Sequence, residues 1–256
     1  MNTRIRRTWI VFFLLLGINA MLAFLTFVLG LAGEMAAAGP ATASMPDVPQ
    51  WILGAANAGL ILLIYGILGA LGIWLSRRVG LPGVYQERAG FRKLFFTPML
   101  LGLLSGAFLI VVDRVLVIAS GWRGFSHPTF PASLIASATA GIGEEIVFRL
   151  FLLTFWLFLL RLLFKQPRLH NVTAWTANGF SALAFAAAHI PATMFMLGVG
   201  TPGEIPTNVL AALLILNTSL ALVAGERFLR VGLVAAVGVH FWADIVWHVL
   251  YPLLIN

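Results

Sequence analysis

Long apolar segments alternate with short polar segments along the whole chain. A helix needs about 20 mostly apolar residues to cross the hydrocarbon layer of a bilayer. We expect seven spans, at residues 8–33, 51–76, 94–120, 131–160, 171–199, 208–224 and 231–254. The sixth is the shortest, and the fourth is long enough to tilt or to extend beyond the lipid. The pattern therefore predicts an all-α fold, a polytopic bundle of transmembrane helices.

The composition excludes the other broad classes of protein. Of the 256 residues, 61% are hydrophobic and only 10% are charged. A soluble fold of this size cannot cover so much apolar surface with polar side chains, and disorder requires low hydrophobicity. The chain has no Cys, which excludes disulfides, thiolate nucleophiles and cysteine-based metal sites.

The basic residues predict the orientation in the membrane. Cytoplasmic loops collect Lys and Arg, and most of the 16 basic residues fall on one side if the amino terminus is inside. The outer segments then carry Arg123 and the acidic residues Glu34, Asp47 and Glu204. We expect a cytoplasmic amino terminus. The net charge of +7 is explained by this asymmetry, so no nucleic-acid partner is expected.

The first span has a second interpretation. A basic start before an apolar run, followed by the small residues Ala36, Ala37 and Ala38, is also typical of a cleaved signal peptide. The apolar stretch is longer than that of most signal peptides, which favours a span that stays in the protein. Cleavage would leave six spans with the same orientation.

Ionisable side chains inside the predicted spans mark candidate functional positions, because charge in hydrocarbon is costly and usually faces a protein interior or a cavity. The spans contain Asp113, Arg114, Glu144, Glu145, Arg149, His189, His240, Asp244 and His248. All but the first two lie on spans four, five and seven, which predicts one polar site shared by these three spans. Adjacent Asp113 and Arg114 do not face each other, and we expect structural roles for them.

Span four contains two adjacent carboxylates and one cation. Glu145 and Arg149 are four residues apart and share a helix face, whereas Glu144 is rotated by about 100°. Arg149 can therefore neutralise Glu145 and leave Glu144 free to act. The alternative is a structural ion pair with a spare carboxylate.

Span five places Phe185 and His189 one turn apart, with Pro191 just beyond. Proline can kink a helix, so we expect a kink just beyond the imidazole. His189 is either a hydrogen-bonded packing residue or, near a carboxylate, a group that orients or activates water.

Span seven carries a polar stripe on an otherwise apolar helix. His240, Asp244 and His248 follow one another at intervals of four. Such a stripe can hold helices together, and two histidines with an aspartate can also bind a metal. The specific zinc signature HExxH is absent from the sequence.

Taken together, the three segments resemble a known family. Glu-Glu-x-x-x-Arg, Phe-x-x-x-His and His-x-x-x-Asn/Asp, in this order, are similar to the three motifs of the CAAX-protease and bacteriocin-processing (Abi) family of glutamic intramembrane proteases. Here the motif residues are Glu144, Glu145, Arg149, Phe185, His189, His240 and Asp244. The resemblance covers about residues 94–254. We therefore expect a protease-like core at 94–256, preceded by two spans at 1–93 without a family motif.

The resemblance implies a role for each motif residue. It implies water activation by Glu144 with His189, support from Glu145 and Arg149, and oxyanion stabilisation by His240 with Asp244. Phe185 and His248 are expected to support this site. Catalysis without a metal or another cofactor is implied, as is a membrane protein or peptide as substrate.

Two positions depart from the family pattern. Leu150 stands where the family often has Gly after the motif Arg. Asp244 stands where Asn would donate an amide hydrogen bond, and an ionised carboxylate cannot donate. Asp244 can instead orient His240, or be protonated itself.

We expect an intramembrane endopeptidase in a bacterial or archaeal plasma membrane. Three alternatives remain open. One is a metalloprotease that uses Glu144, His189, His240 and Asp244 as ligands. Another is a non-enzymatic scaffold or immunity-type protein on the same fold. The third is a transporter, which has less support because no internal repeat is visible. The sequence predicts no particular oligomeric state.

Overall fold

The computed structural model describes residues 3–32, 48–122 and 124–255. Residues 33–47 lie outside these ranges, and with them the expected outer loop, its Glu34 and Asp47, and the candidate cleavage site at Ala36–Ala38. Arg123 also lies outside them. The choice between a retained span and a cleaved signal peptide therefore stays a prediction.

The described chain is built from helices. The α-helices are α1 (Thr3–Val28), α3 (Gln50–Arg78), α4 (Thr97–Ser120), α5 (Ala132–Glu145), α6 (Thr154–Leu163), α7 (His170–Ala188), α8 (Ile190–Leu197), α9 (Thr207–Val231), α10 (Leu233–Asp244) and α11 (Tyr251–Ile255). Segments of π-helix lie at Arg92–Phe96, Ile146–Leu153 and Ile245–Leu250, and short 3₁₀ turns at Pro167–Leu169 and Pro202–Glu204.

Within the described residues, seven continuous helical stretches are long and apolar enough to cross a membrane, as the sequence predicts. They are Ile5–Val28, Gln50–Arg78, Arg92–Ser120, Ala132–Leu163, Pro167–Leu197, Thr207–Val231 and Leu233–Leu254. The predicted all-helical transmembrane bundle is confirmed, and the protein is an integral, multi-pass membrane protein. The orientation of its amino terminus stays a prediction.

The sixth span is longer than expected. The sequence predicts its end near residue 224, whereas α9 continues to Val231. The extra turns contain Glu226, which forms ion pairs with both Arg227 and Arg230. Because these charges neutralise one another along the helix, the helix continues through a segment that hydropathy alone excludes.

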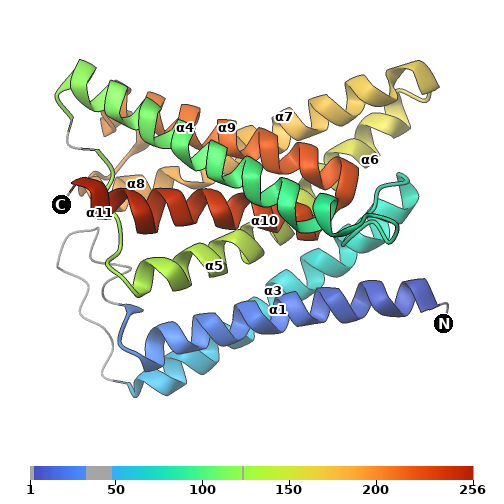
Figure 1. The fold of residues 1–256 in the computed structure, drawn as a ribbon, viewed down its shortest axis with the longest axis horizontal. Coiled ribbons are helices and arrows are strands. Elements are labelled where there is room, and N and C mark those ends of the chain that lie inside the picture. Colours follow the sequence, from blue (N-terminus) through green and yellow to red (C-terminus); the bar gives the residue numbers. More distant parts are fainter. Residues whose placement is uncertain (1–2, 33–47, 123, 256) are drawn as a thin grey trace.

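Helix α10 occupies the middle of the bundle. It packs against α4, α5 and α9, while α1 and α3 form a pair that packs against α5 and the π-helix after it. Figure 1 shows this order, with α1 and α3 along one side of the bundle and the two chain ends at opposite ends of it. The helices that carry the motif residues are thus enclosed by the other spans.

Glycines allow α4 to approach α10 closely. A Cβ atom on Gly102 would lie 2.5 Å from the carbonyl oxygen of Val239, and one on Gly106 would lie 2.5 Å from Cβ of Val246. Small residues four apart are typical of close helix packing in membranes. This GxxxG pair therefore sets the position of the helix that carries His240.

The unusual Leu150 packs against a glycine of α3. Its side chain is completely buried. A Cβ atom on Gly72 would lie 2.3 Å from the Leu150 carbonyl oxygen and 2.9 Å from its Cγ. The small size of Gly72 on the neighbouring helix therefore leaves room for Leu150 on span four.

Two π-helical segments begin directly after site residues. One starts at Ile146, next to Glu145, and the other at Ile245, next to Asp244. Segments of π-helix are rare and are often found at functional sites. They change the direction in which the side chains after Glu145 and after Asp244 point. Neither π-helical segment was predicted from the sequence.

Candidate active site

Glu145 is the centre of a buried polar network. Its Oε2 lies 3.2 Å from Nε of Arg149, and its Oε1 lies 2.8 Å from Nδ1 of His240. The Glu145 and Arg149 side chains are 0% exposed. The ion pair predicted from the four-residue spacing is therefore present. Both carboxylate oxygens of Glu145 are engaged, one on its own helix and one across to α10.

Arg149 also contacts an aromatic ring. Its guanidinium carbon lies 4.6 Å from the centroid of the Phe185 ring, a distance typical of a cation–π interaction. The same ring lies 4.8 Å from the imidazole of His189 and 5.6 Å from that of His240. Phe185 is thus the apolar residue that joins the three motif segments.

Glu144 differs from Glu145 in its surroundings. Its side chain is 32% exposed and lines a cavity. Its nearest charged neighbour is His240, whose Nε2 lies 3.8 Å from Oε2 of Glu144. At that distance the interaction is electrostatic rather than a hydrogen bond. The carboxylate predicted to be free is therefore the one that faces open space.

His240 lies between three carboxylates. Its Nδ1 faces Glu145, and its Nε2 lies 3.5 Å from Oδ2 of Asp244 as well as near Glu144. Both His240 and Asp244 are almost fully buried. Asp244 therefore contacts the imidazole, as expected for a residue that orients it.

His189 lies between the end of α7 and the start of α8, just before Pro191, so the helix is interrupted where a kink is expected. Its Nδ1 lies 2.8 Å from the carbonyl oxygen of Phe185. Because a carbonyl can only accept, Nδ1 carries the proton of this hydrogen bond. In the neutral imidazole Nε2 is then an acceptor, and His189 lines the same cavity as Glu144.

His248 does not continue the polar stripe of His240 and Asp244. It lies beyond the start of the π-helix, and its Nδ1 is 3.1 Å from Nδ1 of His127. His127 belongs to the segment between α4 and α5. Burial lowers the pKa of His127 from its usual 6.5 to about 4. At neutral pH this imidazole is uncharged, so one of the two rings donates to the other.

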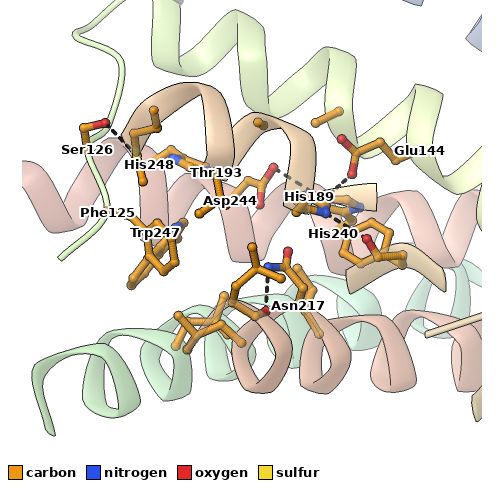
Figure 2. A pocket seen from close by; sticks show the side chains of 18 residues that line it. Phe125, Ser126, Glu144, His189, Thr193, Asn217, His240, Asp244, Trp247 and His248 are labelled. Carbon is orange, nitrogen blue, oxygen red and sulfur yellow. Dashed lines mark hydrogen bonds and ion pairs between the residues drawn. The ribbon is translucent and has the colours of Figure 1, made fainter. Parts of the chain in front are cut away.

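One cavity of about 260 Å³ is lined by the site residues Glu144, Phe185, His189, His240, Asp244 and His248. Glu144, His189 and His240 lie at one end of it, and Phe125, Ser126 and His248 at the other (Figure 2). The walls between are mainly apolar and come from α4, α7, α8, α9 and α10. The polar groups thus meet at the inner end of a largely hydrophobic cavity, the usual form of a small-molecule or peptide site.

Several polar residues of this cavity were not predicted from the sequence. They are Ser126, Thr193 and Asn217, with His127 behind His248. A search limited to ionisable residues in spans passes over Thr193 and Asn217. His127 and Ser126 lie in a connecting segment. The signal that identifies Asn217 is the polar run Asn217-Thr218-Ser219 in the middle of the mainly apolar segment of residues 208–224.

A metal site was one open alternative. Among the described ranges, no three His, Asp or Glu side chains converge closely enough to be grouped as metal ligands. Glu144, His189, His240 and Asp244 all line the cavity, where His240 contacts Glu144 and Asp244 and His189 bonds to the Phe185 carbonyl instead. The absence of a metal from the reaction stays a prediction.

The fold and site define a polytopic helical membrane protein with a buried carboxylate–histidine centre. Residues 126–246, just under half of the chain, match the family described as type II CAAX prenyl endopeptidase Rce1-like. That segment contains all the motif residues from Glu144 to Asp244, so the predicted resemblance to the CAAX-protease family is confirmed. At family level the match supports an intramembrane endopeptidase. No curated protein and no solved structure matches the chain significantly.

Proposed function

We propose that the protein hydrolyses a peptide bond in or near the membrane with a water molecule activated by Glu144 and His189. The observation that carries this proposal is the different engagement of the two adjacent carboxylates. Glu145 has both oxygens engaged by Arg149 and His240. Glu144 is partly exposed in the cavity that also contains His189.

Glu144 and His189 suit the task of holding and deprotonating water. Both groups present acceptors to the cavity: the carboxylate oxygens of Glu144, and Nε2 of His189 in the tautomer fixed by the Phe185 carbonyl. A water molecule that donates to both would have its oxygen lone pairs free to attack. A general base must lie within hydrogen-bond reach of the proton that it removes.

The reaction proceeds in two steps. The water oxygen bonds to the scissile carbonyl carbon while Glu144 takes one of the water protons, and the carbonyl electron pair moves to the oxygen. When this tetrahedral intermediate collapses, the carbon–nitrogen bond breaks and the proton held by Glu144 passes to the leaving nitrogen. The products are a new carboxyl terminus and a new amine.

The residues around His240 prepare the site for this charge. Arg149 and Glu145 fix one side of the imidazole, and Asp244 contacts the other. Since preorganised donors stabilise a developing oxyanion, His240 is proposed to contribute electrostatically to the intermediate. No step requires a metal or another cofactor.

The proposed substrate is a membrane protein or a membrane-associated peptide. The cavity walls are apolar, and the helices around the cavity are long enough to span a bilayer. An apolar segment can therefore reach the carboxylate–histidine end from within the membrane. The plasma membrane of a bacterium or archaeon is the proposed location.

The test compares protein termini in membranes of cells that carry the wild type, Glu144→Gln or His189→Ala. We expect a set of new termini with the wild type that both variants lose, while each variant inserts and unfolds at the wild-type temperature in detergent. Matched controls are Glu204→Gln in the 3₁₀ turn Pro202–Glu204 and the exposed His170→Ala at the start of α7. Full activity of Glu144→Gln would overturn the proposal, and unchanged termini with all variants would favour a non-enzymatic scaffold.

A further inference from the structure

The proposed reaction needs neutral hydrogen-bond donors, and the catalytic end of the cavity has few. Two carboxylates line it, from Glu144 and Asp244, and a third, Glu145, is fully buried behind His240 and paired with Arg149. Negative charge that develops on a substrate oxygen there meets like charge from Glu144 and Asp244. A neutral N–H or O–H donor would stabilise that oxygen most directly.

The histidines offer the cavity one donor. Nδ1 of His240 is engaged by Glu145, whereas its Nε2 lies 3.8 Å from Glu144 and 3.5 Å from Asp244. Nδ1 of His189 donates to the Phe185 carbonyl, and its Nε2 is an acceptor in the neutral ring. Asp244 has no N–H to offer. A second donor must therefore come from another part of the cavity wall.

Asn217 on α9 provides such a donor. It is the single amide side chain among the residues that line the cavity. One N–H of its Nδ2 donates to the carbonyl oxygen of Leu213 at 2.8 Å. This bond holds the plane of the amide, and the second N–H and Oδ1 have no partner among the described residues.

The position of Asn217 is suitable. It lies on the α9 wall with Leu213, Leu216 and Leu220, which also line the cavity at helical spacing. Figure 2 shows its side chain directed from this helix toward the side where Asp244 and His189 lie. The leucines give the amide apolar surroundings, which strengthen a hydrogen bond to a charged oxygen.

We infer that Asn217 binds the substrate and donates its free amide N–H to the carbonyl oxygen of the scissile bond. This inference rests on the proposed hydrolysis and adds a substrate-contacting residue to it. Asn217 then supplies the neutral amide donor that the carboxylate of Asp244 cannot supply from the facing helix.

The alternative role of Asn217 is structural. An Asn that bonds back to the carbonyl four residues earlier is a common way to satisfy an amide within a helix. The two roles differ in their relation to Asp244. If Asn217 is structural, changing Asp244 to Asn has no reason to compensate for its loss. If it is the donor, an amide at position 244 can replace it.

The test measures kcat and KM in proteoliposomes, with internally quenched peptides that contain a cleavage site found by terminal proteomics. We expect Asn217→Leu and Asn217→Asp to lower kcat by roughly 10²-fold with little change in KM, as for the loss of one oxyanion donor elsewhere. In an Asp244→Asn background, the loss caused by Asn217→Leu should shrink to less than about 10-fold. The matched control is Ser219→Ala on the same helix. Ser219 does not line the cavity, and the change removes only its hydrogen bond to the Leu216 carbonyl oxygen.

The outcomes separate the two proposals. If cleavage is lost in Glu144→Gln but Asn217→Leu is as active as the wild type, the role of Asn217 is overturned and the proposed hydrolysis is not. Equal losses from Asn217→Leu in both backgrounds, or a lowered unfolding temperature, show a structural role and also overturn it. A kcat loss in Thr193→Val but not in Asn217→Leu assigns the donor to Thr193. A wild type that cleaves no peptide and changes no terminus overturns both proposals.

Discussion

Glu145 and His240 are 95 positions apart in the sequence, and their side chains meet at 2.8 Å in the buried centre of the bundle. The contact joins α5 to α10, and the second oxygen of Glu145 extends it to Arg149. Because the Glu145 and Arg149 side chains are 0% exposed, each depends on the other for compensation of its charge.

Glu145→Gln should strongly destabilise the protein. It leaves the guanidinium of Arg149 buried without its carboxylate, and breaking one partner of a buried pair costs about 3–5 kcal/mol. Thermal unfolding in detergent measures the effect. The double variant Glu145→Gln/Arg149→Met should recover part of the stability, because it removes the uncompensated charge. Additive losses in the double variant would contradict a coupled pair.

Gly102→Ala should lower both stability and activity. The added methyl would lie 2.5 Å from the backbone oxygen of Val239, so α10 must move away from α4 and carry His240 with it. A Cβ atom on Gly59 of α3 would have no neighbouring atom within 4 Å, so Gly59→Ala is the control. Unfolding temperature and cleavage rate are the measurements, and equal behaviour of the two variants would exclude the role of this contact.

The stability of the wild type should fall as the pH decreases from about 6.5 to about 4. Folded His127 has a pKa lowered to about 4 by burial, against 6.5 for the ordinary group. Between these values the unfolded state binds more protons than the folded state, so acid favours unfolding, and the contribution is fully lost below about pH 4. In His127→Asn this contribution is absent. The difference in unfolding temperature between wild type and variant should therefore change across this window and stay constant above pH 7.

Proteolysis should survive exhaustive removal of metal ions. The proposed chemistry uses only side chains and water, so dialysis against a strong chelator should leave kcat within about twofold of its starting value. Elemental analysis of the same sample confirms that metal is absent. Activity that disappears with the metal and returns on addition of a divalent cation would support the metalloprotease alternative.

The spans were predictable from the sequence because each depends on local composition. Seven apolar runs predict seven helices, and the structure contains all seven. The exception was the end of α9, where Glu226 compensates two arginines. That compensation depends on the conformations of the side chains, which hydropathy along the sequence does not describe.

The site was predictable to the extent that spacing along one helix decides it. The Glu145–Arg149 pair follows from four-residue spacing alone. The contact between Glu145 and His240 depends on how α5 packs against α10, which the spacing does not specify. The His127–His248 pair joins a connecting segment to a π-helix, and neither feature has a signal in the residue pattern. The division into an amino-terminal part at 1–93 and a core at 94–256 stays a prediction.

The π-helix at Ile245–Leu250 makes span seven sensitive to changes in length. Each residue of an α-helix turns the following side chains by about 100°. Deleting one residue from this apolar segment would rotate His248, Trp247 and Tyr251 together, and they could no longer meet His127. Substitutions between aliphatic residues should therefore be tolerated where single-residue deletions are not. When sequences are aligned in this region, a gap of one residue indicates a different structure at the end of the cavity where His248 lies, even where every motif residue is retained.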